Sequence, residues 1–332
     1  MQYRHRAHFS LAARVVIAIG ILVIGIAIGQ YSDTFLPGAP KTFHDVTDLA
    51  DGYRFIDPLL FCSDHNLSGQ TAAFSQRLQN NLTSIIDRKK QAGELNDASV
   101  LYRDLSNGPR VSVNPDLQSS PASLLKVPLA LSIMRRAETD PAFLQKKVLM
   151  NIPDQNGGEH FTAPKKAEPE REYTIEELID LSLINSDNNA TDLLIMQLSD
   201  RELRKSYEDL GIQVPTDGAS AYTMNVGVYG SFFRILYNAS YLSRDNSEAF
   251  LSDLAGSTFT QGIVAGIPQG VTVAHKFGEY GDASGLKQLH DCGIIYRPNR
   301  PYLLCVMTQG KDFDVLAGAI RDISKTAWEA GE

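Results

Sequence analysis

Ser123-Leu124-Leu125-Lys126 opens a long apolar run that extends to Glu138. Residues 119–122, which read Ser-Ser-Pro-Ala, precede the run and favour a turn. A serine and a lysine three positions apart lie on the same face of a helix, within hydrogen-bonding reach of each other. We therefore predict a helix over residues 123–138 that begins with this serine–lysine pair.

The pair carries a specific chemistry. A serine hydroxyl is a weak nucleophile until a neighbouring base takes its proton. Lys126 can act as that base if burial lowers its pKa, and the apolar neighbours predict burial. The positive end of the helix dipole would also stabilise an oxyanion. Taken alone, the motif has a second interpretation, an ordinary helix start at which Ser123 is the cap.

Two more polar clusters follow at wide spacing. Ser186-Asp187-Asn188 comes directly after a predicted helix, residues 175–185, which Thr174 and Glu177 cap. His275-Lys276-Phe277-Gly278 ends a predicted strand, where a glycine lets a ligand approach the backbone. Alone, the first cluster also fits plain helix capping, and the second also fits a strand end with a surface lysine.

The remaining elements predict an α+β fold, because a block of helices separates two groups of strands. The expected strands are residues 99–105, 110–114, 271–277, 288–296 and 302–308, with a hairpin turn at Ser106-Asn107-Gly108. The other expected helices are residues 71 to about 93, 190–198, 200–210, 226–242 and 315–329, and residues 154–171 are expected to form a loop.

In this order the three clusters resemble the S-x-x-K, S-D-N and K-T-G motifs of the class A β-lactamases and related penicillin-binding D,D-peptidases. The resemblance extends from about residue 72 to residue 330. It implies a five-stranded antiparallel sheet flanked by helices, together with an all-helical lobe. It also implies a serine hydrolase that forms an acyl-enzyme on β-lactams or on D-Ala-D-Ala-type peptides, without a cofactor or a metal.

The resemblance assigns a role to each matching residue. Ser123 would be acylated, and Lys126 would help to deprotonate it. Ser186 would relay a proton to the leaving nitrogen, Asn188 would bind the substrate amide, and Lys276 would hold the substrate carboxylate.

Substrate binding would also involve the end of the third cluster. Gly278 would let the substrate approach the strand, and the backbone N–H groups of Ser123 and Glu279 would form the oxyanion hole. One such donor contributes about 3 kcal/mol to transition-state stabilisation.

The sequence departs from the family pattern at two places. Phe277 replaces the threonine whose hydroxyl normally helps to bind the carboxylate. Residues 212–225 contain no glutamate, whereas class A β-lactamases carry there the glutamate that activates the deacylating water. Asp217 is the acid in this segment, and it is either a substitute base or a turn residue before Gly218. We therefore expect slow deacylation.

The N-terminal segment predicts the compartment. Residues 1–14 are basic, residues 15–29 form an uninterrupted apolar run, and acids follow, which places the N-terminus inside and the remainder outside the cell membrane. An uncleaved signal anchor is favoured over a cleaved signal peptide ending near Ala27-Ile28-Gly29. The expected organisation is a tail and transmembrane anchor (1–31), a linker (32–70) and a hydrolase domain (71–332).

Charge and cysteine content narrow the alternatives. The formal net charge of -8 argues against nucleic acid as the main partner, since phosphate binding needs a basic surface. The three cysteines form no zinc motif. Cys292 and Cys305 flank the turn at Arg297–Arg300 symmetrically, so they would face each other as a disulfide or, as we favour, as two buried thiols.

Two other functions compete with the hydrolase. One is a β-lactamase-like fold that has lost its chemistry and binds peptidoglycan or a protein partner, which Phe277 and the missing glutamate would favour. The other is a Ser-His-Asp hydrolase using His275 or His290, but the sequence has no G-x-S-x-G motif.

Overall fold

The computed structural model describes residues 52–58, 69–106, 108–212 and 222–331. The predicted transmembrane anchor and most of the predicted linker lie outside these residues. Within them, no helix combines the length and the apolar character that a membrane span requires.

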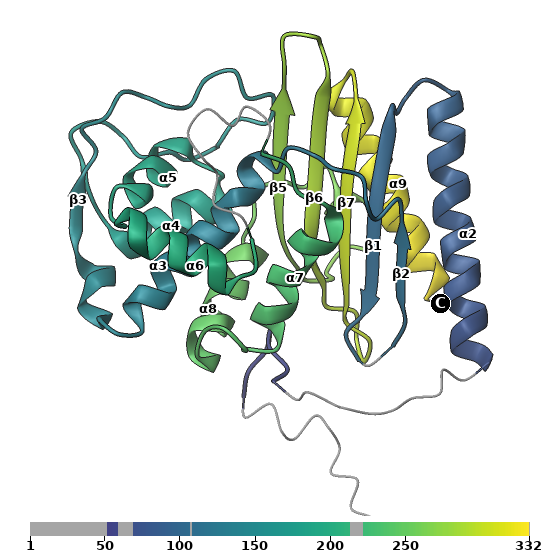
Figure 1. The fold of residues 1–332 in the computed structure, drawn as a ribbon, viewed down its shortest axis with the longest axis horizontal. Coiled ribbons are helices and arrows are strands. Elements are labelled where there is room, and N and C mark those ends of the chain that lie inside the picture. The colour runs from purple at the N-terminus through teal and green to yellow at the C-terminus, as the bar shows by residue number, and fades with distance from the viewer. Residues whose placement is uncertain (1–51, 59–68, 107, 213–221, 332) are drawn as a thin grey trace, which may run out of the picture. The chain divides into compact units, whose positions relative to one another are not determined.

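The fold is built on a five-stranded antiparallel sheet with the order β2-β1-β7-β6-β5 (Figure 1). Its strands are β1 (Asp97–Asp104), β2 (Arg110–Val113), β5 (Val273–Gly281), β6 (Lys287–Ile295) and β7 (Tyr302–Gly310). All five occupy the stretches expected from the sequence. The last hairpin brings β7 between β6 and β1, so the strands that follow the helical block join those that precede it.

Helices cover both faces of this sheet (Figure 1). One face carries α2 (Gly69–Gln91) and α9 (Phe313–Ala330). The other face carries α7 (Val226–Tyr237), and α8 (Arg244–Ala255) packs against β5. A helical lobe lies on the β5 side of the sheet and consists of α3 (Lys126–Ala137), α4 (Ile175–Ile184), α5 (Asn188–Ile195) and α6 (Asp200–Asp209). Short 3-10 turns lie at η2 (Ala122–Leu125), η3 (Pro141–Gln145) and η4 (Ile263–Gly266), and β3 (Lys147–Leu149) pairs with β4 (Glu172–Thr174).

Strand alternation divides the interior into two apolar cores. In β7, Leu303 faces α7, whereas its neighbour Leu304 belongs to the core with α2 and α9. Successive side chains of a strand point to opposite faces, so each strand contributes to both cores. The sheet is therefore buried on both sides, and its central strands consist almost wholly of buried residues.

The predicted cap of α4 is confirmed. The Thr174 hydroxyl accepts from the Glu177 backbone N–H, and the Glu177 carboxylate accepts from the Thr174 N–H. This reciprocal pair satisfies two donors at the helix start. It fixes the beginning of α4, which in turn fixes where the Ser186 cluster emerges at the other end.

The two cysteines form a disulfide, so the favoured interpretation of two free thiols is wrong. Cys292 and Cys305 are register partners on β6 and β7, as the symmetry about the intervening turn predicts. Both point into the same core and are fully buried. The sequence placed the two residues opposite each other, but it did not reveal how close the two strands bring the sulfur atoms.

Candidate active site

Ser123 lies at the junction between a turn and a helix. The predicted helix over residues 123–138 is partly corrected, because its first turn is the 3-10 turn η2 and the α-helix begins only at Lys126. The backbone N–H of Leu124 donates to the Pro121 carbonyl at 2.9 Å. The predicted contact between Ser123 and Lys126 is still formed, since the Lys126 Nζ lies 3.1 Å from the Ser123 Oγ.

The cluster Ser186-Asp187-Asn188 has two roles, since one residue caps a helix and the other two contact Lys126. Asp187 is the fully buried N-cap of α5, and its carboxylate accepts from the backbone N–H groups of Asn189 and Ala190. Ser186 and Asn188 instead turn toward Lys126. The Lys126 Nζ lies 2.6 Å from the Ser186 carbonyl, 3.3 Å from the Ser186 Oγ and 2.7 Å from the Asn188 Oδ1.

Ser186 adopts a left-handed backbone conformation, with φ of 60°. Such a conformation is uncommon for a residue with a side chain and persists only where the surroundings hold it. Here the Lys126 ammonium holds both the carbonyl and the hydroxyl of the residue. The strained residue thus lies at the centre of the cluster.

The third cluster reaches the same point from the sheet. β5 is an edge strand of the described sheet, and its Lys276 Nζ donates to the Ser186 Oγ at 2.9 Å. The hydroxyl of Ser186 therefore lies between two lysines that are separated by 150 positions in the chain. The next residue on the same face of β5, Gly278, packs against η2, beside Ser123.

Both lysines are buried, and burial sets their charge state. Burial lowers the pKa of Lys126 to about 8, although the carboxylates of Asp187 and Glu159 act to raise it. Burial, reinforced by the charge of Lys126, holds the pKa of Lys276 well below its ordinary value. Lys126, with a pKa of about 8, is therefore partly neutral near pH 7 and can accept a proton.

Gly278 is required by space. A Cβ at this position would lie 2.9 Å from the Leu124 backbone nitrogen and 2.9 Å from the Pro121 carbonyl oxygen, both in or beside η2. Backbone atoms cannot move aside as a flexible side chain would. Any side chain here therefore pushes the Ser123 turn away from β5.

We expect Gly278→Ala to lower the rate of acylation by about 100-fold, because a displacement of about 1 Å at a reacting group has that effect. Gly281→Ala on the same strand is the control, since its Cβ would meet its nearest neighbour, a Phe313 ring carbon, at an ordinary 3.9 Å. The measurement is the acylation rate constant of the two variants after both melt close to the wild-type temperature. Equal rates for Gly278→Ala and Gly281→Ala would contradict the spatial argument.

Phe277, which replaces the family's threonine, belongs to an aromatic cluster. Its side chain is 5% exposed and stacks on Phe259, with ring centroids 4.2 Å apart. The Phe161 ring meets both, at 6.2 Å from Phe277 and 5.0 Å from Phe259. Phe277 therefore offers no hydroxyl at this position, and its ring belongs to the core on the α2 and α9 side of the sheet.

A segment that the sequence indicated only as a loop contributes to the site. Residues 155–161 contact the start of α5 on one side and β5 on the other. The backbone N–H of Asn188 donates to the Asn156 Oδ1 at 3.0 Å, and the Asn188 Nδ2 donates to the Glu159 Oε1 at 2.5 Å. The Phe161 N–H donates to the carboxylate of Glu279, whose pKa is raised by burial.

Sequence reasoning did not name Glu159, Asn156 or Phe161 as site residues. The segment has no periodicity and no motif, and its polarity is typical of any loop. The contacts depend on how the chain crosses from β3 to β4 in the folded state, which local pattern does not encode.

A cavity of about 500 Å³ opens beside the Ser123 hydroxyl. Ser123, Lys126, Asn188 and Thr191 form its polar side, and its apolar side is lined by Leu125, Leu129, Ile195, Leu203 and Tyr207. A few convergent polar groups in a mainly apolar hollow are typical of small-molecule sites. The described lining includes no carboxylate, and Asp217, the suggested substitute base, lies outside the described residues.

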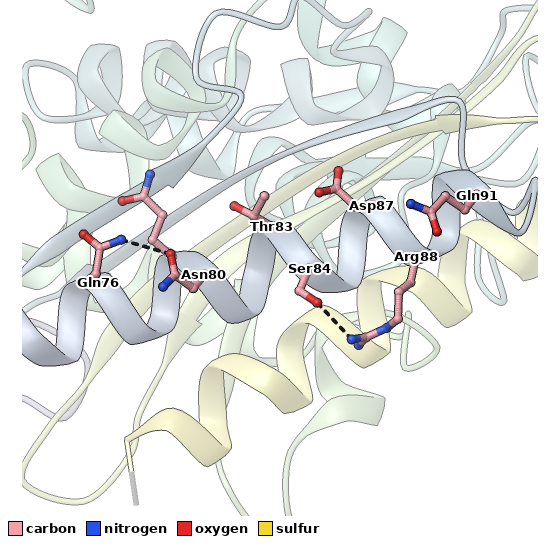
Figure 2. A pocket seen from close by; sticks show the side chains of 8 residues that line it. Gln76, Asn80, Thr83, Ser84, Asp87, Arg88 and Gln91 are labelled. Carbon is pink, nitrogen blue, oxygen red and sulfur yellow. Dashed lines mark hydrogen bonds between the residues drawn. The ribbon is translucent and has the colours of Figure 1, made fainter.

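A hollow of similar volume, about 490 Å³, runs along the outer face of α2 (Figure 2). Its lining comes from one helix, and neighbouring side chains satisfy each other, as Gln76 with Asn80 and Arg88 with Ser84. It contains no nucleophile beside a base. The cavity at Ser123 is therefore the better candidate for chemistry.

The two histidines considered for a Ser-His-Asp site make buried contacts within and beside the sheet instead. His275 pairs with Asp291 at 2.7 Å, and His290 contacts the Ser120 carbonyl oxygen at 3.0 Å. Both rings are buried. In the described part of the chain, neither forms a hydrogen bond with a serine hydroxyl.

The fold and the site define a class of protein, the serine hydrolases with a Ser-Lys pair between an antiparallel sheet and a helical lobe. The chain belongs to the β-lactamase enzyme family, whose pattern it matches over residues 77–330. No curated protein matches the chain significantly.

Solved structures share the fold. A mutant of PBP-A in an acyl-enzyme complex with penicillin G is 22% identical, covering 77% of this chain and 96% of its own, with a TM-score of 0.65. The TLA-1 extended-spectrum β-lactamase is 19% identical, covering 77% and 98%, with a TM-score of 0.65. A β-lactamase from Xanthomonas campestris is 18% identical, covering 78% and 99%, with a TM-score of 0.66.

Proposed function

We propose that this protein is a membrane-anchored extracytoplasmic serine hydrolase that forms an acyl-enzyme on β-lactams or on D-Ala-D-Ala-type peptides and releases the acyl group slowly. One observation carries the proposal. A continuous hydrogen-bonded path joins the Ser123 Oγ, the Lys126 Nζ, the Ser186 Oγ and the Lys276 Nζ, with successive distances of 3.1, 3.3 and 2.9 Å.

This path suits acyl transfer. The Ser123 Oγ attacks the acyl carbon while its proton moves to the neutral Lys126 amine. The new C–O bond forms, the C–N bond breaks, and Ser186 gives its proton to the leaving nitrogen and recovers one from Lys126. Before these steps, the Lys276 Nζ, which lies beside Ser186, would bind the substrate carboxylate as a hydrogen-bond donor, without the help of a hydroxyl at position 277.

Two further parts of the proposal have separate support. Slow deacylation is supported by the sequence of residues 212–225, which contains no glutamate to activate water. The anchor and the outside location are supported by the basic residues 1–14 and the apolar residues 15–29.

Intact cells making the full chain, treated with a membrane-impermeant fluorescent penicillin, should yield one labelled band in the membrane fraction. The label should persist for many minutes after excess unlabelled drug is added, and hydrolysis of a chromogenic cephalosporin should be slow. Labelling that appears only after lysis would contradict the outside location. A label in the soluble fraction would contradict the anchor.

Rapid multiple turnover of the cephalosporin would refute slow deacylation alone. No label under any of these conditions would refute acyl-enzyme formation and favour a fold that only binds its ligand.

A further inference from the structure

The backbone directly before Ser123 is strained. Ala122 adopts a left-handed conformation, with φ of 49°. A residue with a Cβ rarely adopts this conformation, which persists only where the surrounding structure holds it. Because Ala122 immediately precedes Ser123, the contacts that hold this turn also set the position of the Ser123 hydroxyl relative to the Lys126 amine, 3.1 Å away.

Two side chains of β6 hold the peptide groups that lead into the turn. The Gln288 Oε1 accepts from the backbone N–H of Ser120 at 2.9 Å. The His290 Nε2 lies 3.0 Å from the carbonyl oxygen of the same residue. Positions 288 and 290 lie on one face of the strand, so both side chains reach the turn from the sheet. Ser120 is thus held at both of its backbone polar groups, two residues before Ala122.

The ring of His290 is fixed in one tautomer. It is fully buried, and burial lowers its pKa to about 4, so the ring is neutral near pH 7. The Nδ1 accepts from the backbone N–H of Thr308 at 3.3 Å. A neutral imidazole carries one proton, which must then lie on Nε2. The Nε2–H group therefore donates to the Ser120 carbonyl.

The sheet supports the turn at a second point. Gly278 of β5 is the register partner of His290 on β6. The Gly278 backbone packs closely against the Pro121 carbonyl oxygen and the Leu124 nitrogen. The His290 ring thus contacts the start of the turn, and the neighbouring strand contacts its middle. Two adjacent strands together hold a backbone conformation that the chain would not keep alone.

We propose that His290, together with Gln288, is a positioning residue for acylation, because its hydrogen bond to Ser120 keeps the strained backbone at Ala122 in the conformation that presents the Ser123 hydroxyl to Lys126. This inference rests on the proposed acyl-enzyme function and adds to it two residues outside the three motifs. No proton moves to or from His290 in the reaction. Without the hydrogen bond, Ala122 relaxes toward an ordinary conformation and the Ser123 hydroxyl moves away from Lys126.

Two side chains of similar length test the role of the donor. His290→Met removes it, and the rate constant of acylation by benzylpenicillin should fall by about 10- to 100-fold, the effect of displacing a reacting group by up to about 1 Å. His290→Gln supplies an amide N–H and should restore most of the rate. The dependence of labelling on penicillin concentration separates this rate constant from the affinity of the non-covalent complex. That affinity should change little, because His290 is not in the described lining of the cavity.

Ala122→Gly distinguishes positioning from a general effect on folding. Glycine adopts the left-handed conformation without strain, so the turn then depends less on His290. Relative to Ala122→Gly alone, the double variant with His290→Met should be slower by less than about threefold, since the two changes are coupled. If His290 only stabilised the fold, the loss would have the same size in both backgrounds. Gln288→Met should show the same dependence on Ala122→Gly, and it carries the test if His290→Met does not fold.

Ser324→Ala is the matched control. Ser324 is fully buried on α9, and its hydroxyl donates to the Ile263 carbonyl at 2.9 Å. The variant loses a comparable buried hydrogen bond and should acylate as the wild type does. Wild-type rates in His290→Met, or a loss of equal size in both Ala122 backgrounds, would overturn the inference. Failure of the wild type itself to be acylated would instead refute the proposed function.

Discussion

Ser123→Ala should abolish covalent labelling by penicillin, with a fall in acylation of about 10⁴-fold or more, because the variant lacks the atom that forms the ester. Ser123 is half-buried at the mouth of the cavity, and its Oγ receives a hydrogen bond from Lys126. The measurement is the intensity of the fluorescent band after a fixed reaction time.

Ser132→Ala is the matched control for this loss. Ser132 is a buried serine on the same helix, and its hydroxyl bonds the Pro128 carbonyl at 2.9 Å, away from the lysines. It should label as the wild type does. Equal labelling of Ser123→Ala and the wild type would mean that another residue is acylated.

Lys126→Met should lower acylation by about 10² to 10⁴-fold, the usual contribution of a positioned base. In the wild type, burial lowers the pKa of this lysine to about 8. The neutral amine is the reactive form, so the acylation rate should rise as pH increases and level off above about pH 8. At pH 7 roughly one tenth of the molecules would hold a neutral Lys126.

Lys126→Arg distinguishes the role of Lys126 as a proton acceptor from its role as a positive charge. Arginine keeps the positive charge but does not lose its proton in this pH range. If Lys126 acts as a base, the arginine variant should be nearly as slow as the methionine variant and should lose the rise with pH. An arginine variant with near wild-type rate would mean that the site needs only a cation. Melting temperatures of both variants establish that they fold.

The sequence was informative about the fold where a pattern is local and repeated. Short apolar runs located the three C-terminal strands, and Thr174 with Glu177 located the start of α4. The sequence was less informative where local geometry depends on residues that are distant in the chain. The 3-10 turn at Ser123 packs closely against Gly278, and the disulfide depends on how closely two buried strands approach each other. Neither property is present in the residues alone.

The same division holds for the site. Ser123, Lys126, Ser186, Asn188 and Lys276 could be identified because each lies in a short motif, and the structure brings all five together. Glu159 could not be identified, because its place beside Asn188 is created by a loop held in tertiary contacts.

The central claim is that penicillin opens on the Ser123 hydroxyl. Intact-mass measurement of the purified wild-type protein after brief exposure to benzylpenicillin, followed by peptide mapping, tests it most directly. We predict a gain of one penicillin mass, carried by the peptide that contains Ser123. An unchanged mass, or an adduct on a peptide without Ser123, would contradict the claim.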